Sequence, residues 1–179
     1  MALFRINPKK LKKKGAFERC VKALVDANEE KRANAAEALG DIGDVRALEP
    51  LMGALGDEWL IVRAAAAEAL GKLGDATAVP SLITALNDSD EYVRRDASQA
   101  LGEIGDTAAT VPLIEALKDD WTTVRAAAAK ALGMIGGAEI VDPLLEALHD
   151  GEELVRKEAA AALRKGGSTG PMLSALKSE

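Results

Sequence analysis

Arginine and aspartate recur at fixed positions in this sequence, and their spacing is the first sign of chemistry. The arginines lie 31 residues apart and an aspartate precedes each by six, giving Asp26/Arg32, Asp57/Arg63, Asp88/Arg94, Asp119/Arg125 and Asp150/Arg156. A guanidinium and a carboxylate form a strong ion pair, whereas a row of unpaired guanidinium groups would bind an anion. Because a partner of opposite charge recurs with the same period, pairing is favoured and an anion-binding stripe is the alternative.

Other residues that commonly bind metals or perform catalysis are scarce. The chain has one histidine, His149, and one cysteine, Cys20. A multi-histidine metal centre, a cysteine-based zinc site and an internal disulfide are therefore excluded. Cys20 occupies a position that holds leucine in later copies of the repeat, which favours an inert core thiol over a nucleophile. We find no phosphate-binding loop and no Ser/His/Asp set, so we expect no catalytic residue, metal or cofactor.

The arginines belong to a tandem repeat of 31 residues, which predicts two helices in each unit. Apolar residues over 62–73 follow the 3.6-residue period of one helix, and Pro80 opens a second helix after a short turn. We expect Asp57 to be the N-cap of the first helix, and Gly71 and Gly74 to loosen and end it. Leucines keep the same phase in every copy, at Leu39, Leu70, Leu101, Leu132 and Leu163 and at Leu24, Leu55, Leu86, Leu117 and Leu148.

Many helix positions are alanine, which is a strong helix former but adds little side-chain bulk. A single hairpin of such helices cannot bury enough surface to be stable, whereas stacked copies share one continuous core. The sequence therefore predicts an all-α, right-handed α-solenoid of about five helical hairpins with terminal caps. We expect a single domain over 1–179, with a basic N-terminal cap and first outer helix (1–25), repeats (26–167) and a short C-terminal capping helix (168–179).

Charge is distributed unevenly along the chain. The net charge is −6, but residues 1–22 carry eight basic side chains and one acidic side chain, and the remainder is strongly acidic. An acidic body repels a phosphate backbone, so a nucleic-acid partner is not expected. We interpret the basic segment as a solubilising cap, with contact to anionic lipid or RNA as the alternative. No apolar stretch is long enough to span a membrane, and we expect a cytoplasmic protein, with a monomer favoured.

Several short motifs resemble one known repeat family. Val93-Arg94, Ala97, Ala100-Leu101-Gly102, Ile104-Gly105-Asp106 and the run 112–117 follow the pattern of HEAT-like repeats of the phycobilisome-lyase type. The resemblance covers roughly residues 17–165 and implies an armadillo-like helical solenoid. It further implies that the aspartate and arginine columns form a structural ladder between successive repeats.

The resemblance also implies which helices line the concave surface, namely the first helix of each unit. Columns on these helices that vary between copies are our candidate binding face: Leu60, Ile61, Glu68, Lys72, Glu91, Tyr92, Arg95, Asp96, Gln99, Glu103, Thr122, Thr123, Lys130, Met134, Glu153, Leu154, Lys157 and Glu158. A mixed charged face with a few apolar side chains favours a protein partner over a small ligand. A solvated face without a partner is the alternative.

Trp59 and Trp121 share one column of the repeat, two units apart. They could anchor a partner, since tryptophan is enriched among the residues that contribute most to binding. They could equally pack at the start of the first helix, and we favour packing.

These observations favour a non-catalytic scaffold that binds a protein partner, whose identity is unknown, on its concave face. One alternative is a subunit resembling a bilin lyase or lyase chaperone, acting on a chromophore-bearing protein. Another is a synthetic or consensus-like repeat scaffold, which the unbroken 31-residue phase favours and the irregular ends oppose. Deoxyhypusine hydroxylase, an enzyme with similar repeats, uses His-Glu pairs to hold two irons. Because this sequence has no such pair, that activity is excluded.

Overall fold

The computed structural model describes residues 15–165, and every regular element in this part of the chain is helical. The expected C-terminal capping helix and most of the basic N-terminal segment lie outside the described residues. The elements are α2 (Ala16–Ala23), α3 (Glu29–Ile42), η1 (Val45–Ala47), α4 (Leu48–Ala54), α5 (Leu60–Leu73), η2 (Ala76–Ala78), α6 (Val79–Ala85), α7 (Glu91–Ile104), η3 (Thr107–Ala109), α8 (Thr110–Ala116), α9 (Thr122–Ile135), α10 (Val141–Ala147) and α11 (Glu153–Lys165).

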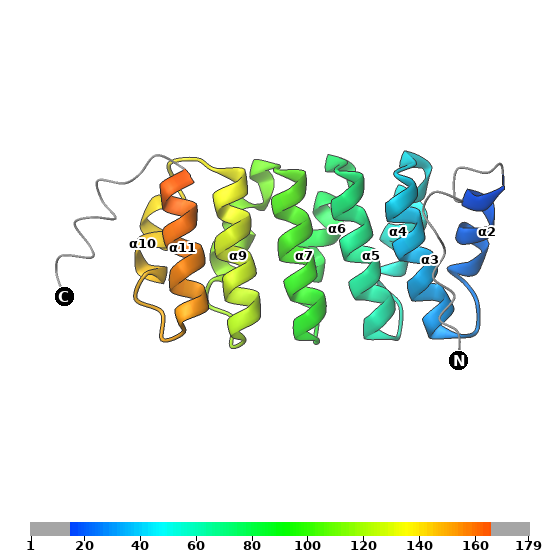
Figure 1. Cartoon of the computed structure of the whole chain (residues 1–179), viewed down its shortest axis with the longest axis horizontal. Helices are drawn as coiled ribbons and strands as arrows, with labels where there is room; N and C mark the ends of the chain where they lie inside the picture. Colours follow the sequence, from blue (N-terminus) through cyan, green and yellow to red (C-terminus); the bar gives the residue numbers. More distant parts are fainter. Residues whose placement is uncertain (1–14, 166–179) are drawn as a thin grey trace.

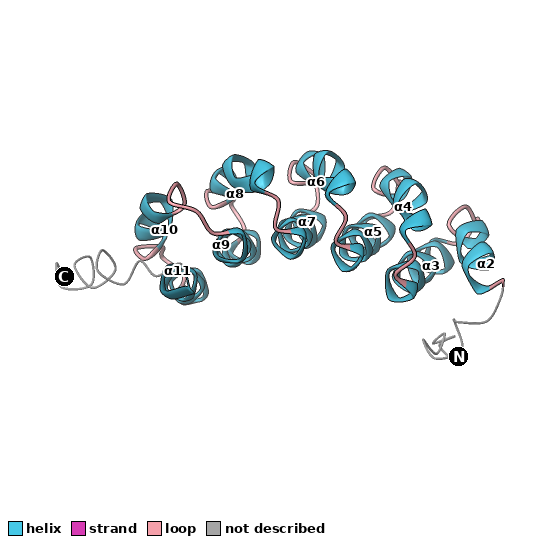
Figure 2. Cartoon of the chain, turned by 90° about the horizontal axis from the view of Figure 1, so that it is seen from above, coloured by secondary structure: helices cyan, strands magenta, loops and turns pink. Residues whose placement is uncertain are grey.

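The helices form two curved layers that run the length of the molecule. The long helices α3, α5, α7, α9 and α11 stand side by side (Figure 1). Seen from above, they line the concave side of the arc, and the short helices α2, α4, α6, α8 and α10 lie on the convex side (Figure 2). Each long helix packs against the next, so every unit buries its surface against its neighbours. The predicted all-α solenoid of 31-residue hairpins is confirmed.

The long helices begin three residues after the ladder aspartates, and this corrects one prediction. Asp57 is not an N-cap, because Trp59 holds that position and its side chain makes no capping hydrogen bond. Asp57 instead accepts a hydrogen bond from the backbone N–H of Trp59 at 3.0 Å, in a turn that precedes the helix. Side-chain N-caps occur at Asn28 for α3 and Asp90 for α7.

A second aspartate column starts the short helices, and the sequence patterns did not reveal its role. Asp44, Asp75 and Asp106 each accept a hydrogen bond from the backbone N–H two residues later, which opens η1, η2 and η3. In the next unit this position is Gly137, and no 3₁₀ turn precedes α10. The aspartate carboxylate therefore accounts for the 3₁₀ turn in the units that carry it.

The core lies between the two layers and is built from the repeated columns. Five leucines of the long helices and four of the short helices are buried almost completely: Leu39, Leu70, Leu101, Leu132, Leu163, Leu51, Leu82, Leu113 and Leu144. Cys20 is buried in the leucine column, as expected for a core thiol, and burial raises the pKa of that thiol. A neutral, buried thiol is a poor nucleophile.

Glycine inside the long helices has a packing role, which corrects the expectation that Gly71 loosens its helix. A Cβ atom placed on Gly71 would lie 2.8 Å from the Cα of Ala100 in the adjacent helix. Gly40, Gly102 and Gly133 face the equivalent alanines of their neighbours in the same way. Alanine and glycine together let the long helices approach closely along the stack. Gly74, in contrast, ends its helix as expected, with φ of +68°.

Within residues 15–165 no helix is both long enough and apolar enough to cross a bilayer.

Candidate functional site

The ladder residues form ion pairs that join each unit to the next. The arginine of one unit donates two hydrogen bonds to the carboxylate of the aspartate 25 residues later, at 2.7–3.1 Å, in Arg32–Asp57, Arg63–Asp88, Arg94–Asp119 and Arg125–Asp150. Paired side chains are at most 16% exposed. The four guanidinium groups are thus engaged by carboxylates, which leaves them poorly placed to bind an external anion.

Each ladder arginine also fixes the loop in front of its own helix. Arg94 Nη1 donates to the backbone carbonyls of Asp88 and Ser89, at 2.9 and 3.2 Å. The aspartate six residues earlier therefore contributes its carbonyl to this arginine, while its carboxylate binds the arginine of the preceding unit. At the two ends of the ladder, Asp26 pairs with Lys31, and Arg156 meets no carboxylate within residues 15–165.

The ion pairs lower the pKa of the ladder aspartates. The hydrogen-bonded guanidinium of Arg32 is the main reason that the pKa of Asp57 is low, and Arg125 has the same effect on Asp150. Burial is the largest single influence on the pKa of Asp88 and Asp119 and raises it. The ion pair and a backbone hydrogen bond together outweigh burial there, so both values are lowered as well.

These shifts predict a loss of stability in acid. A carboxyl whose folded pKa lies below the unfolded value of about 3.9 contributes its full stabilisation above that pH and loses it as the pH falls through the folded pKa. We expect the free energy of unfolding to decline below about pH 4. Each ladder aspartate with a lowered pKa adds at most about 1.4 kcal/mol per pH unit to the slope of this decline. Denaturant unfolding at pH 7 and at pH 3 measures the decline.

Asp119→Asn provides the control, because it removes one of the carboxyl groups whose pKa is lowered by folding. The variant should lose less stability than the wild type between pH 7 and pH 3. An identical decline in the two proteins would contradict the assignment of Asp119 to this acid sensitivity.

The candidate binding residues lie on the four long helices α5, α7, α9 and α11, on the concave side of the arc (Figure 2). Most are exposed, whereas Glu91, Arg95, Asp96, Thr122 and Glu158 are partly buried. The predicted binding face does not include unit one, whose equivalent positions lie 31 residues before the named ones. Asp41 is one of them, and its carboxylate accepts a hydrogen bond from Lys72 at 3.1 Å.

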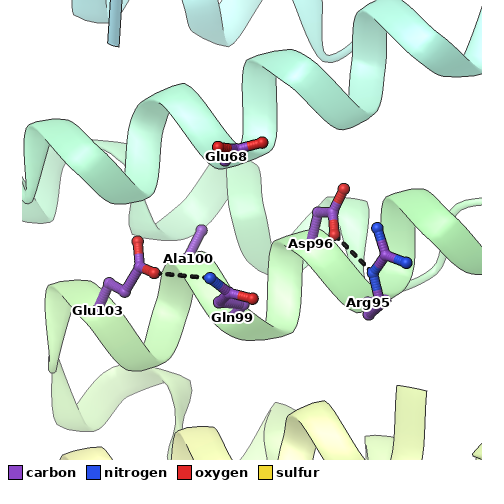
Figure 3. A pocket seen from close by; sticks show the side chains of 6 residues that line it. All are labelled: Glu68, Arg95, Asp96, Gln99, Ala100 and Glu103. Carbon is purple, nitrogen blue, oxygen red and sulfur yellow. Dashed lines mark hydrogen bonds and ion pairs between the residues drawn. The ribbon is translucent and has the colours of Figure 1, made fainter. Parts of the chain in front are cut away.

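Five of the candidates meet in a cleft between α5 and α7. The cleft has a volume of about 300 Å³ and is lined by Glu68, Arg95, Asp96, Gln99, Ala100 and Glu103 (Figure 3). Arg95 Nε donates to Asp96 Oδ1 at 2.7 Å, and Gln99 Nε2 donates to Glu103 Oε1 at 2.8 Å. Three carboxylates against one guanidinium give the cleft a preference for positive charge.

Asp96 is the least exposed carboxylate of the cleft, with 16% of its side chain exposed. Burial raises the pKa of Asp96, and the charge of Glu68 on the facing helix raises it further, although Arg95 opposes both effects. The same guanidinium lies over the ring of Tyr92, 5.2 Å from its centroid. Arg95 is thereby held between the carboxylate of Asp96 and the ring of Tyr92.

The other candidates stand apart from this cleft. Lys72 bridges Glu68 and Asp41 across two long helices, and Lys157 pairs with Glu153 within α11. Thr122, Thr123, Lys130 and Met134 lie on α9 and do not line the cleft. The candidates on α9 and α11 therefore lie outside the polar cleft between α5 and α7.

Trp59 and Trp121 occupy the N-cap positions of α5 and α9, at the same end of two parallel long helices. They are 49% and 53% exposed, so about half of each side chain packs against the protein and half faces solvent. Anchoring a partner and packing at the start of the helix are therefore both compatible with the positions of the two tryptophans.

No group of three or more histidine, cysteine, aspartate or glutamate side chains within residues 15–165 is arranged to hold a metal ion. The polar groups of the cleft bind one another across short distances. Such a surface is suited to recognising charge and shape on a partner.

Comparison with known proteins identifies the repeat. The chain matches the family of HEAT repeats over residues 6–64, 61–124 and 110–177. Comparison with curated proteins gives no significant match.

Solved structures with the same fold include a natural lyase and designed proteins. The complex of CpcE and CpcF of phycocyanin lyase from Nostoc sp. PCC7120 is 27% identical, with a TM-score of 0.79, over 96% of this chain and 69% of that chain. A designed armadillo repeat protein in complex with the peptide (KR)4 is also 27% identical, with a TM-score of 0.68, over 89% and 85% of the two chains. An engineered protein is 26% identical, with a TM-score of 0.69, over 87% and 81%. The match over nearly the whole sequence and the stacked helical hairpins confirm the expected repeat type: the chain belongs to the HEAT-repeat family.

Proposed function

We propose that this protein is a non-catalytic scaffold that binds a segment of another protein on its concave surface, across α5, α7, α9 and α11. The observation that carries the proposal is the position of the exposed large apolar side chains. Most of those in the described residues lie on the long helices or at their N-caps: Trp59, Leu60, Ile61, Tyr92, Trp121, Met134 and Leu154. Apolar surface gathered on one face is typical of a protein-binding site.

The polar residues of the same face support a binding role over catalysis. Asp96 is held by Arg95, Glu103 by Gln99 and Glu68 by Lys72. A catalytic acid or base must reach a substrate atom, whereas these carboxylates are already engaged with neighbours. They can still complement the charge of a partner that covers the face.

Two of the similar structures support binding of a polypeptide. The designed armadillo protein holds the peptide (KR)4, and CpcE is in complex with CpcF. A solenoid of stacked helices gives an extended concave surface, on which a long segment makes contacts with several repeats at once.

A photo-crosslinking amino acid tests the proposed face in a lysate of the source cells. We expect the photo-crosslinking amino acid, when it replaces Tyr92, to yield an adduct with one distinct protein, because Tyr92 is 49% exposed in the middle of the face. The matched control places the same residue at Val111, which is 66% exposed on the short helix α8. Mass spectrometry identifies each adduct, and Tyr92→Ala should reduce capture by a crosslinker at Leu154. Equal adducts from positions 92 and 111 would contradict the concave face as the binding site.

A lyase-like subunit that acts on a chromophore-bearing protein is the second candidate, and the similarity to phycocyanin lyase favours it. It differs from the scaffold in requiring a bilin. Visible absorbance of the purified protein after incubation with a bilin and a phycobiliprotein lacking its chromophore separates the two candidates. Transfer of colour to the phycobiliprotein would favour the lyase-like role. A consensus-like synthetic scaffold, the third alternative, would give neither colour transfer nor a specific adduct.

A further inference from the structure

A row of exposed apolar side chains follows the N-terminal ends of the long helices. We call it the apolar row and define it as Trp59, Leu60, Ile61, Tyr92, Trp121 and Leu154, which are 38–53% exposed. All six lie at the N-cap or in the first turn of α5, α7, α9 or α11. These helices are parallel neighbours whose N-terminal ends lie along the lower edge of the molecule in Figure 1, so the row crosses four units.

A large part of each side chain in the row stays exposed to solvent in the described part of the chain. An isolated exposed leucine needs no explanation, but six large apolar side chains in one line mark an interaction surface. The same first-turn column holds Ile61, Tyr92 and Leu154 in three of the four units. A partner that lies across the helices would therefore meet an apolar side chain at nearly every unit.

Acidic side chains accompany the row on the same edge. Glu58 and Asp120 directly precede the two tryptophans, and Glu152 occupies the tryptophan column of the last unit. All three are exposed, and the side chain of Glu58 is 80% exposed with only a distant contact to Arg32, at 3.8 Å. The arginines near this edge are the ladder arginines and Arg95, which lies over the ring of Tyr92. Their guanidinium groups are already bound by carboxylates or backbone carbonyls. A partner with positive charge between its apolar groups is thus electrostatically complementary.

The spacing of the units defines the spacing within the partner. Packed helices lie about 10 Å apart, and an extended peptide in the polyproline II conformation advances about 3.1 Å per residue with three residues per turn. Each unit therefore corresponds to about three residues of such a peptide, and every third side chain of the peptide faces the row. Resting on the proposed function, we infer that the apolar row binds an extended segment of a partner protein with a large apolar side chain at every third residue and lysine or arginine between them.

Three synthetic peptides, added to the full-length protein, test this inference. The probe is (Leu-Lys-Ser)4, the charge control is (Leu-Glu-Ser)4, and the spacing control has the composition of the probe with its four leucines adjacent. The two tryptophans of the chain both lie in the row, so their fluorescence reports directly on binding there. We expect the probe to shift the emission and to bind at least about tenfold more tightly than either control, a difference of about 1.4 kcal/mol.

Two variants connect the binding to the named residues. Ile61→Ser with Leu154→Ser should weaken binding of the probe about tenfold while leaving the melting temperature nearly unchanged, because both side chains are exposed. Glu58→Lys with Asp120→Lys should reverse the charge preference, so that (Leu-Glu-Ser)4 becomes the tighter ligand. Val111→Ser on α8 is the matched control and should bind the probe like the wild type.

Equal binding of the probe and the charge control, or binding that ignores the Ile61/Leu154 substitutions, would overturn the inference. The tryptophan emission of the protein alone could also shift as the protein concentration rises, and this shift could be absent from the Ile61/Leu154 variant. That result would overturn the inference, because it would make a second copy of this chain the occupant of the row. Failure here is distinguishable from failure of the proposed function. If the crosslinker at position 92 captures a partner but the peptides show no preference, the scaffold stands and the inferred chemistry of its partner is wrong.

Discussion

Replacing Arg94 with alanine is expected to lower the free energy of unfolding by about 3 kcal/mol, one of the two largest effects of a single substitution that we expect in this protein. The carboxylate of Asp119, whose side chain is only 14% exposed in the folded protein, would lose both hydrogen bonds from the guanidinium. The carbonyls of Asp88 and Ser89 would lose their donor as well. Water replaces these bonds incompletely at a site that is mostly buried.

Denaturant unfolding at pH 7 measures this loss, and Arg156→Ala is the matched control. Arg156 makes the same kind of backbone contacts, to the carbonyls of Asp150 and Gly151, but no ion pair within residues 15–165. We expect the control to lose about 1 kcal/mol, so that the difference between the two variants isolates the link between units. Equal losses would show that the arginine column stabilises its own loop and that the ion pair adds nothing.

Gly102→Ala is expected to destabilise the protein by about 2 kcal/mol, even though alanine is the better helix former by about 1 kcal/mol. The new Cβ atom would lie 2.7 Å from the Cα and 2.8 Å from the Cβ of Ala131 in α9. Neither atom can rotate away, because one belongs to the backbone and the other is bonded directly to it. The helices α7 and α9 would have to separate, and the loss of contact would extend along the interface between the two units.

Gly53→Ala on the short helix α4 is expected to have the opposite effect and to stabilise the protein. A Cβ atom at Gly53 would meet no atom within 4 Å, so the substitution should stabilise the protein by up to about 1 kcal/mol through helix propensity alone. Thermal unfolding measures both effects: the melting temperature should fall in Gly102→Ala and rise in Gly53→Ala. Stabilisation by both substitutions would mean that the close approach of α7 to α9 is not required.

The sequence by itself determined the architecture. A 31-residue period with leucine, alanine and glycine columns in constant phase leaves few alternatives to stacked helical hairpins, because each unit can bury its apolar face only against a copy of itself. The positions of Leu70 and Leu101 in the core follow directly from that period. The concave placement of the candidate face came from the resemblance to HEAT-like repeats.

Contacts between units were decided only in the tertiary structure. Periodicity places one ladder aspartate and one ladder arginine in every unit, such as Asp88 and Arg94. It does not determine whether an arginine binds the aspartate six residues earlier or the one 25 residues later. The answer depends on how far each unit is displaced and rotated relative to the next, which brings Arg94 to Asp119. The same displacement brings Gly71 against Ala100, although in the sequence Gly71 resembles a glycine that weakens its helix.

The features of the binding face have the same origin. Glu68 belongs to one unit, and Arg95, Asp96 and Glu103 belong to the next, so their cleft exists only where α5 and α7 are packed together. The apolar row likewise forms only when four parallel helices present their first turns along one edge. Local propensity and period act within a unit, whereas close packing of one unit on the next determines which side chains meet.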